Sequence, residues 1–497
     1  MSGYLPTIGL EIHAELKTQT KMFCRSKNDA DETRANVNIC PVCMAHPGTL
    51  PVINHDAVMH VLRVGCALGG KLADYTEFDR KNYFYPDLPK GYQLSQYEYP
   101  LVSGGELLGF AITRVHLEED SASSMHDDKS GATSIDYNRA GVPLMELVTE
   151  PVLHSAEDAG RFARELQLLL RYLGASEANM EKGEMRVEAN ISVSKNGKMD
   201  LSRSSGEVGR TGARRAPVLG TKVEIKNLNS FRSVERAIAF EIKRQTELLE
   251  RDESVVQETR GWDENKQQTF PQRVKEGNAD YRYFPDPDLP SLKLSEVSGF
   301  SAKDLSSTLP ELPWKRRERY LEVGVKPDDA DSFVRDAALG DFFDEVSAGY
   351  DKESILLAAN YIANDLVKVT RDAEERDTKR RAEIPISARN FKEIVDMLRE
   401  RKLNSRTAKD VLALSVESGD SPHRIAAERG FVGGAMDDAA ISAAVDEIIA
   451  ENSDVVADFR SGKGPALEFL VGQCMKALRG AADPMALREL LKSKLGV

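Results

Sequence analysis

A proline-rich segment divides this sequence into two parts with different secondary-structure patterns. Residues 284–290, Phe-Pro-Asp-Pro-Asp-Leu-Pro, interrupt any regular element, because proline lacks a backbone N–H and restricts φ. Before them, strand-like segments are interspersed with helical ones, whereas after residue 313 only helical periodicity remains. The sequence therefore predicts an α+β domain at 1–292, an all-α helical domain at 293–405 and a small all-α tail domain at 406–497.

Four segments of the first part have the period-two alternation of half-buried strands. In residues 8–17, apolar side chains occupy one face, while Glu11 and His13 share the other. The same pattern predicts strands at 112–120, 186–193 and 223–227.

Two amphipathic helical segments lie between these strands. Ser155, followed by Asp158, is predicted to cap the first of them, and Gly174 to end it. Ser233 is predicted to cap the second. Strands and helices in this irregular order favour a mixed or antiparallel sheet over the parallel sheet of a strict β-α-β repeat.

The charge distribution distinguishes the C-terminal end from the rest of the chain. The 497 residues carry a net charge of −13, which argues against nucleic-acid binding over the whole surface. Within residues 459–497, however, seven lysines and arginines stand against three acidic residues. We expect this end to contact a phosphate backbone.

Neither a signal peptide nor a membrane span is predicted. The N-terminus lacks a basic segment followed by an apolar run, and no stretch approaches about 18 consecutive apolar residues. The five cysteines are too few, and odd in number, for a disulfide framework. A cytoplasmic protein with reduced thiols or a bound metal is expected.

Carboxylates beside apolar residues are the candidate functional groups. Glu11 and His13 point the same way, where they would either bind a divalent cation or simply be solvated. Glu119 shares its strand face with apolar residues, so its charge needs a partner or a metal ion, unless it lies beyond the strand end. Further carboxylates in apolar surroundings or on a predicted strand are Glu146, Glu150 and Glu188.

No familiar nucleotide-binding loop is found in the sequence. Residues 65–72, Gly-Cys-Ala-Leu-Gly-Gly-Lys-Leu, approach the Walker A pattern, but Leu72 replaces the hydroxyl residue that reaches Mg²⁺. The segment before them has the periodicity of a helix instead of a strand. Any nucleotide must therefore be bound in another way.

Three cysteines have a spacing that suits zinc. Cys40 and Cys43 form a Cys-x-x-Cys motif, and Cys24 precedes it. A fourth ligand would have to come from elsewhere in the chain.

Residues 79–92 combine cations with aromatic side chains, among them Arg80, Lys81, Tyr83, Phe84 and Tyr85. Such a composition suits phosphate contacts and base stacking. A surface loop with packed tyrosines would have the same composition.

Several blocks occur together in an order that resembles one enzyme family. The blocks are Gly9-Leu10-Glu11-Ile12-His13-Ala14-Glu15-Leu16, Phe78-Asp79-Arg80-Lys81-Asn82-Tyr83-Phe84-Tyr85-Pro86-Asp87, Gly91-Tyr92-Gln93-Leu94-Ser95-Gln96, Leu117-Glu118-Glu119-Asp120, Lys226-Asn227-Leu228-Asn229-Ser230 and Asp280-Tyr281-Arg282-Tyr283-Phe284-Pro285. Over essentially its whole length, the sequence resembles the GatB family, the B subunits of the aspartyl/glutamyl-tRNA(Asn/Gln) amidotransferase, including that family's YqeY-type tail.

The resemblance implies an activity that composition could not indicate. The family binds misacylated Glu-tRNA(Gln) or Asp-tRNA(Asn) and phosphorylates the side-chain carboxylate with ATP and Mg²⁺. Ammonia from a glutaminase partner then displaces the phosphate. The implied assembly is a heterotrimer with an amidase (the A subunit) and a small linker protein (the C subunit). The implied fold is a glutamine synthetase-like cradle, a helical domain and a tRNA-binding tail.

The resemblance also implies roles for individual residues. The implied Mg²⁺ ligands are Glu11, His13, Glu119 and Glu150, which with Glu188 make up the implied catalytic set. Lys81 would contact the phosphates of ATP, and Lys463 and Lys476 would contact tRNA. Glu188 stands where the family usually has aspartate, so its role in metal or ammonia handling is open.

Two departures and two alternatives accompany the resemblance. Ser26 replaces a cysteine that many family members have in their zinc set, and residues 202–217 look like an insertion. A tRNA-binding scaffold without chemistry, or a free-standing ligase that uses free ammonia on a small acid, would share some of these features. The sequence is compatible with Glu-tRNA(Gln), Asp-tRNA(Asn) or both as the substrate.

Overall fold

The computed structural model describes residues 3–127, 129–195, 219–274, 281–376, 384–431, 438–460, 463–478 and 484–496. The chain divides into two compact units, Met1–Pro313 and Trp314–Val497. The domain boundaries at 292 and 405 that the sequence predicts stay predictions. The predicted insertion at 202–217 lies outside the described residues.

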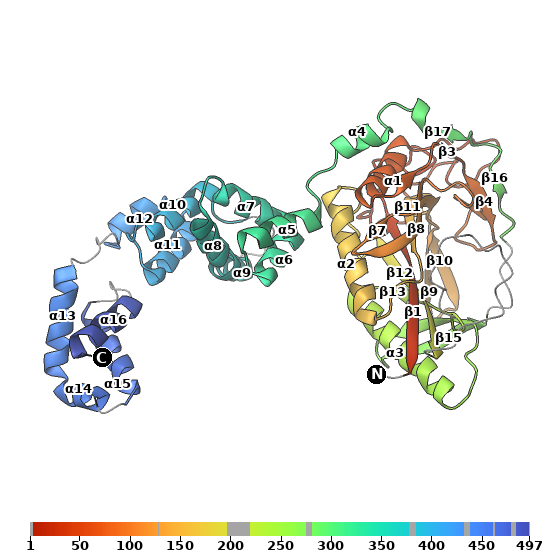
Figure 1. Ribbon diagram of the computed structural model, residues 1–497. Coiled ribbons are helices and arrows are strands. Elements are labelled where there is room, and N and C mark those ends of the chain that lie inside the picture. Colours follow the sequence, from red (N-terminus) through yellow and green to blue (C-terminus); the bar gives the residue numbers. More distant parts are fainter. Residues whose placement is uncertain are drawn as a thin grey trace, which may run out of the picture. The chain divides into compact units, whose positions relative to one another are not determined.

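Unit 1 contains a ten-stranded mixed sheet, which confirms the predicted sheet type (Figure 1). The strand order is β15-β14-β13-β12-β1-β11-β8-β6-β2, with β7 on β8, and only the β13–β14 pairing is parallel among the described strands. The strands are β1 (Tyr4–Glu15), β2 (Lys71–Leu72), β6 (Val102–Ser103), β7 (Glu106–Leu107), β8 (Phe110–Glu119), β11 (Pro143–Thr149), β12 (Met185–Lys195), β13 (Val223–Leu228), β14 (Glu258–Asp263) and β15 (Gln268–Val274).

Three smaller sheets complete the strands of unit 1. They have the orders β16-β4-β5, β10-β9 and β17-β3. Their strands are β3 (Tyr75–Thr76), β4 (Asp79–Asn82), β5 (Tyr92–Ser95), β9 (Ser123–Asp127), β10 (Ala132–Asp136), β16 (Phe284–Pro285) and β17 (Leu292–Lys293). The sheet β16-β4-β5 brings residues 281–285 beside the cation- and aromatic-rich stretch that precedes β5.

Three helices cover the apolar face of the large sheet. They are α1 (His55–Ala67), α2 (Ala156–Tyr172) and α3 (Phe231–Glu250), which contact β8, β1 and β12, respectively (Figure 1). On β1, Ile8, Leu10 and Ile12 are buried, as the alternation predicts. Helix α1 ends at Ala67, within the Walker-like residues 65–72, which confirms that a helix and not a strand leads into them.

The helix caps agree with one sequence prediction and contradict another. The Ser155 hydroxyl accepts a hydrogen bond from the Asp158 N–H at 3.0 Å and caps α2, as predicted. The predicted cap at Ser233 is wrong, because Ser230 accepts a hydrogen bond from the Ser233 N–H at 3.0 Å and begins α3. Ser233 instead lies in the first turn of the helix.

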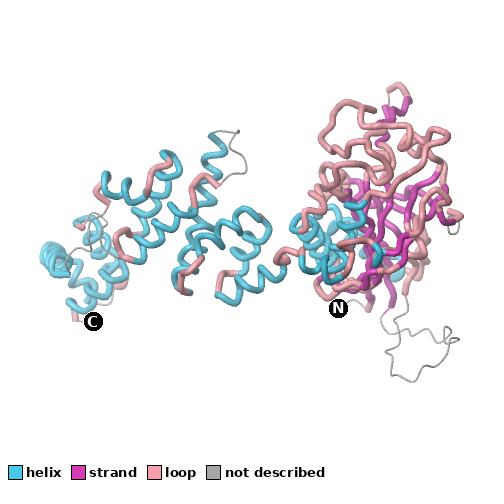
Figure 2. Tube along the Cα trace, turned by 90° about the horizontal axis from the view of Figure 1, so that it is seen from above, coloured by secondary structure: helices cyan, strands magenta, loops and turns pink. Residues whose placement is uncertain are grey.

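The described part of unit 2 contains helices and loops only, which confirms the predicted helical C-terminal region (Figure 2). Near the end of unit 1, η2 (Leu294–Glu296) and α4 (Ala302–Ser307) precede it. The later helices are α5 (Pro313–Val323), α6 (Pro327–Arg335), α7 (Ala337–Ser347), α8 (Lys352–Tyr361), η3 (Ile362–Leu366), α9 (Val367–Arg376), α10 (Ala388–Arg399), α11 (Ser405–Ser418), α12 (Pro422–Glu428), α13 (Asp438–Glu451), α14 (Ser453–Arg460), α15 (Pro465–Ala477) and α16 (Pro484–Leu495). None of the helices in the described ranges has the length and apolar character needed to cross a membrane.

Candidate functional site

The polar face of the large sheet gathers charged side chains from three neighbouring strands. His13 on β1 lies opposite Glu146 on β11, and Glu146 lies opposite His116 on β8. Residues that face each other across a pair of strands project from the same side of a sheet, and so do residues two apart on one strand. Glu11 and Glu118 therefore join the other three, and we call these five residues the acid–histidine cluster.

Glu146 lies at the centre of the acid–histidine cluster. One of its oxygens is 3.3 Å from His13 Nε2 and 3.4 Å from His116 Nε2. Glu118 Oε1 is 3.5 Å from His116 Nε2, and Glu11 Oε1 is 3.9 Å from His13 Nε2. Within two overlapping triplets, which share Glu146, the candidate ligand atoms lie within 4.8 Å of one another.

The charges of the acid–histidine cluster suit a divalent cation. Burial, followed by the negative charge of Glu146, raises the pKa of Glu11 to about 7. Burial by itself would lower the pKa of His116, but Glu146 and Glu118 raise it to about 9. The buried carboxylates are thus compensated by a proton on Glu11 and by protonation of His116. A bound cation would supply the same positive charge in place of these protons. Carboxylate oxygens with imidazole nitrogens are suitable ligands for such an ion.

Lys81, the predicted phosphate-binding residue, lies beside the acid–histidine cluster. Its Nζ is 3.6 Å from Glu118 Oε1. Burial favours the neutral amine, but the surrounding acidic groups, of which Glu118 contributes most, together outweigh it and raise the pKa of Lys81 above its ordinary value. Strand β5 holds Glu118 in place, since this carboxylate accepts hydrogen bonds from Gln93 Nε2 at 2.8 Å and Ser95 Oγ at 2.6 Å. The site therefore keeps a half-buried cation next to Glu118.

Glu188 borders the acid–histidine cluster on the other side. On β12 it lies opposite Glu11, and its carboxylate is 2.8 Å from Lys226 Nζ. Lys226 is also 3.4 Å from Glu224. Glu188 is thus next to the cluster but already has a cationic partner.

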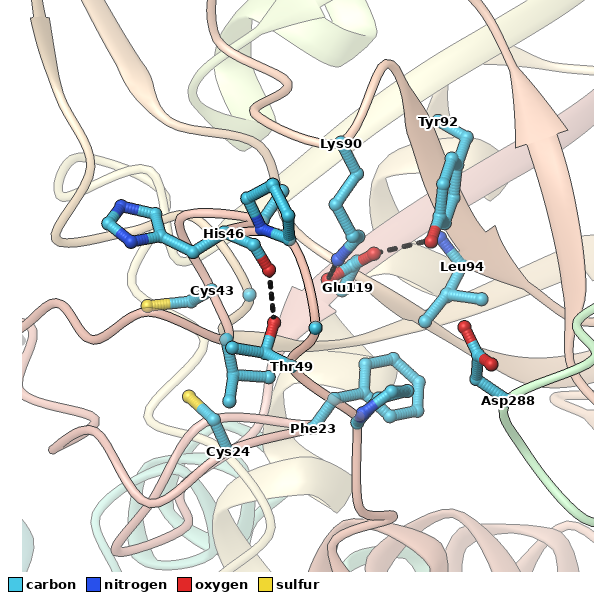
Figure 3. A pocket seen from close by; sticks show the side chains of 16 residues that line it. Phe23, Cys24, Cys43, His46, Thr49, Lys90, Tyr92, Leu94, Glu119 and Asp288 are labelled. Atoms are coloured by element: carbon cyan, nitrogen blue, oxygen red, sulfur yellow. Dashed lines mark hydrogen bonds and ion pairs between the residues drawn. The ribbon is translucent and has the colours of Figure 1, made fainter.

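The structure places Glu119 and Glu150 outside the cluster. Glu119 accepts a hydrogen bond from the Leu94 N–H at 2.9 Å and forms an ion pair of 2.5 Å with Lys90 (Figure 3). Glu150 accepts a hydrogen bond from the Thr113 hydroxyl at 2.8 Å. Their predicted roles as metal ligands stay predictions, although both carboxylates are engaged elsewhere.

Sequence reasoning did not select His116 and Glu118 of the cluster, and it named Glu146 only as one of several carboxylates in apolar surroundings. A local signal for the first two was present, because His116 and Glu118 repeat on β8 the two-residue spacing of Glu11 and His13 on β1. The apolar surroundings of Glu146 marked it as a candidate, but its place beside His13 depends on the register between β1 and β11.

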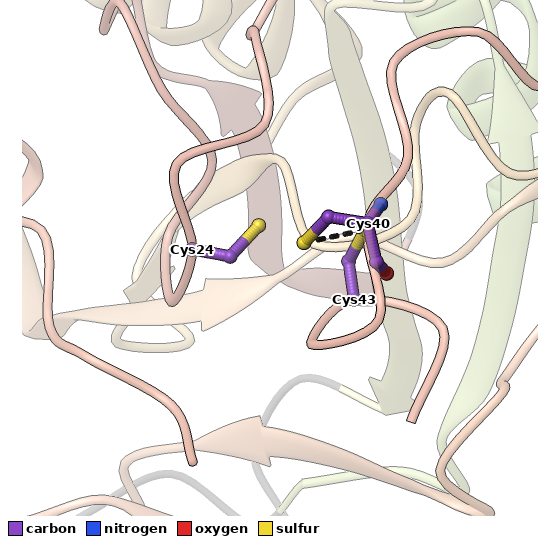
Figure 4. Close-up of side chains that lie close together, drawn as sticks. All are labelled: Cys24, Cys40 and Cys43. Atoms are coloured by element: carbon purple, nitrogen blue, oxygen red, sulfur yellow. Dashed lines mark hydrogen bonds between the residues drawn. The ribbon is translucent and has the colours of Figure 1, made fainter. Parts of the chain in front are cut away.

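The three cysteines of the predicted zinc site converge in the structure (Figure 4). The sulfur atoms of Cys24, Cys40 and Cys43 lie within 4.8 Å of one another, and those of Cys40 and Cys43 are 3.9 Å apart. A hydrogen bond from Cys24 is the largest of several causes that lower the pKa of Cys43 to about 4. Ser26 Oγ is 3.7 Å from Cys43 Sγ, and the buried Lys21 Nζ is 3.8 Å from the same atom. Three thiols thus suit three ligand positions of a tetrahedral zinc ion, and a hydroxyl stands near them.

Glu119 lines a cavity of about 260 Å³ together with Cys24 and Cys43 (Figure 3). Lys90 and Tyr92 line the same cavity. Glu119 therefore shares a cavity with two of the three cysteines.

The two predicted tRNA-binding lysines lie in the last part of unit 2. Lys476 is exposed in the last turn of α15, and Lys463 precedes this helix and pairs with Asp458 at 2.8 Å. The apolar core beneath them is built from α13, α14, α15 and α16 and includes Leu470, Cys474 and Leu491.

Comparison with known protein families assigns a class to each part of the chain. Residues 6–298 match the model of the GatB/GatE catalytic domain, and residues 341–495 match the model of the GatB domain. The first match includes the sheet and the whole acid–histidine cluster, so unit 1 contains a catalytic domain of this class.

Relatives of known name identify the family more closely. The B subunit of the aspartyl/glutamyl-tRNA(Asn/Gln) amidotransferase of Thermomicrobium roseum is 43% identical, with 98% of each chain aligned. The protein of the same name from Thermus thermophilus is 42% identical over 99% of this chain and 100% of its own. This chain belongs to the GatB family of amidotransferase B subunits, which form part of glutamine-hydrolysing ligases, and this confirms the resemblance.

Proposed function

We propose that this chain phosphorylates the side-chain carboxylate of Glu-tRNA(Gln), Asp-tRNA(Asn) or both with ATP, and then transfers the acyl group to ammonia. The observation that carries the proposal is the acid–histidine cluster with Lys81 beside it. A glutamine synthetase-like cradle, in which a mainly antiparallel sheet presents its polar face to substrates, is part of the same proposal.

The chemistry requires a carboxylate to become a good acyl donor. A substrate carboxylate oxygen attacks the γ-phosphorus of ATP, and ADP leaves. Ammonia then attacks the acyl carbon, phosphate leaves with the bonding electron pair, and the new nitrogen loses a proton. Mg²⁺, when bound, neutralises the phosphate oxygens during the first step.

In this proposal, each residue has a separate role. Glu11, His13, Glu118 and Glu146 would hold Mg²⁺, and the Lys81 ammonium would bind phosphate oxygens as charge develops on them. Glu188, paired with Lys226, borders this site and would take part in metal or ammonia handling.

The proposed enzyme needs partner subunits, because this chain does not itself supply the ammonia. The names of the relatives designate one component of a larger enzyme. We propose a cytoplasmic heterotrimer in which an amidase, the A subunit, releases ammonia from glutamine and a small protein, the C subunit, completes the assembly. The basic end of unit 2, with Lys463 and Lys476, binds the phosphate backbone of the tRNA.

The proposal is tested by reconstituting the complex and supplying ammonium chloride in place of glutamine. We expect amide formation on at least one of the two misacylated tRNAs, and we expect it to require this chain, ATP and Mg²⁺. Tight tRNA binding without ADP release would support the scaffold alternative instead. Amidation of free glutamate or aspartate without tRNA would support the free-standing ligase.

Zinc binding by the three thiols is a second part of the proposal. We expect Ser26→Cys to increase zinc affinity at least about tenfold, because it adds a fourth thiolate where a weak hydroxyl ligand now stands. Competition with a chromophoric chelator measures the affinity, and metal analysis measures the zinc content. Ser134→Cys, which adds a thiol to an exposed strand position, should have no effect. Equal zinc affinity in the Ser26→Cys variant and the parent chain would show that position 26 does not limit binding.

A further inference from the structure

A group of tyrosine rings lies next to the acid–histidine cluster. Lys81 Nζ, which contacts Glu118, also lies 5.4 Å from the centre of the Tyr281 ring. The Tyr281 ring packs edge to face against Tyr83, with 5.9 Å between their centres. The Tyr83 hydroxyl donates a hydrogen bond of 2.9 Å to Gln93, and Gln93 donates to Glu118. The first rings are therefore linked to Glu118 through Lys81 and Gln93.

The aromatic array continues from the cluster to the surface. Tyr281 contacts Tyr283, with 6.0 Å between ring centres. Tyr283 stacks on Tyr97 at 4.4 Å, with an angle of only 13° between the rings. Tyr97 is 63% exposed, so the outermost ring of the stack is accessible to a ligand. We call Tyr281, Tyr283 and Tyr97 the tyrosine platform.

The tyrosine platform has the properties of a surface for unpaired bases. A flat, accessible ring that already stacks on another ring is suited to receive a nucleobase. A cation flanks the array, since Lys81 Nζ lies over the Tyr281 ring. Aromatic rings together with cations are the combination that binds single-stranded nucleic acids.

Resting on the proposed function, we propose that the tyrosine platform stacks the unpaired 3′-terminal nucleotides of the substrate tRNA. The amino acid is esterified to the terminal ribose. The carboxylate can therefore reach the acid–histidine cluster only if that nucleotide lies next to it. The platform begins beside Lys81, which meets this requirement. The adenine of ATP is separated from its γ-phosphate by a ribose and two further phosphates, so it fits this position less well.

The proposal is tested with Tyr97→Ala in the reconstituted complex. The probes are an uncharged tRNA(Gln) transcript and the same transcript without its unpaired 3′ nucleotides, and fluorescence anisotropy at constant salt measures binding. We expect Tyr97→Ala to weaken binding of the complete transcript by about 5- to 150-fold and to leave the shortened transcript unaffected. Tyr97→Phe, which keeps the ring, should bind both transcripts normally.

Tyr99→Ala is the matched control, because Tyr99 is also exposed (40%) but packs against Tyr75 instead of the platform. Equal effects of Tyr97→Ala on both transcripts, or no effect on either, would overturn the proposal. A higher KM for ATP with unchanged tRNA binding would assign the platform to the nucleotide and also overturn it. If the parent complex amidates tRNA and Tyr97→Ala binds it normally, the platform assignment fails while the proposed function stands. If the parent complex amidates neither tRNA, the proposed function itself fails.

Discussion

Glu146→Gln is expected to reduce ATP-dependent amide formation by the assembled complex at least about 100-fold. Glu146 belongs to both triplets of candidate ligand atoms and contacts His13 and His116. Glutamine keeps the size of the side chain but removes the charge that a divalent cation needs. A 100-fold loss corresponds to about 2.7 kcal/mol of transition-state stabilisation, within the range of metal-assisted charge neutralisation. The rate of ADP release and calorimetric titration with Mg²⁺ measure the effect.

Glu150→Gln is the matched control for this prediction. Glu150 lies four residues later, and its carboxylate is engaged with Thr113 instead of the cluster. We expect it to retain activity within about threefold, the range usual for a lost hydrogen bond away from the reaction. Loss of activity in Glu150→Gln together with normal activity in Glu146→Gln would favour the ligand set implied by the resemblance over the acid–histidine cluster.

Lys81→Met is expected to lower kcat/KM for ATP by about 100- to 1,000-fold, the usual result of removing one preorganised group that stabilises developing negative charge. Lys81 is a mostly buried ammonium 3.6 Å from Glu118, so water cannot readily replace it. Methionine retains much of the volume but cannot bind phosphate oxygens. Steady-state kinetics with varied ATP measure the effect, and thermal unfolding verifies that the variant is folded.

Two further variants separate the charge of Lys81 from its structural contribution. Lys81→Arg keeps the positive charge and should restore part of the activity. Lys17→Met removes an exposed lysine that pairs with Glu177, and it should leave ATP kinetics unchanged. Normal ATP kinetics in Lys81→Met would contradict the assignment of Lys81 to the phosphates.

Local patterns were sufficient for much of the fold. The alternation of β1 predicted that Glu11 and His13 share a face, and the helical periodicity before residue 65 excluded a nucleotide-binding loop. The error at the start of α3 has a local cause. Ser230 and Ser233 are both good capping residues, and only the backbone conformation of Ser230 shows which one is the cap.

The selection of Glu119 as a candidate metal ligand shows what sequence patterns within one strand cannot predict. Glu119 was favoured because it shares a face with apolar residues and a buried charge needs compensation. The structure supplies such compensation through Lys90 and the Leu94 N–H, while the predicted role of Glu119 as a metal ligand stays a prediction. The partner of a buried charge can thus be a residue that is distant in the sequence or a backbone group.

The sequence by itself determined the family of this protein, the order of its strand-rich and helical parts, and the face of β1 that carries Glu11 and His13. The tertiary structure decided which carboxylates join them. Residues two apart on a strand share a face by geometry, but the register between strands depends on packing over the whole sheet. That register places Glu146 between His13 and His116, while Glu150 bonds to Thr113.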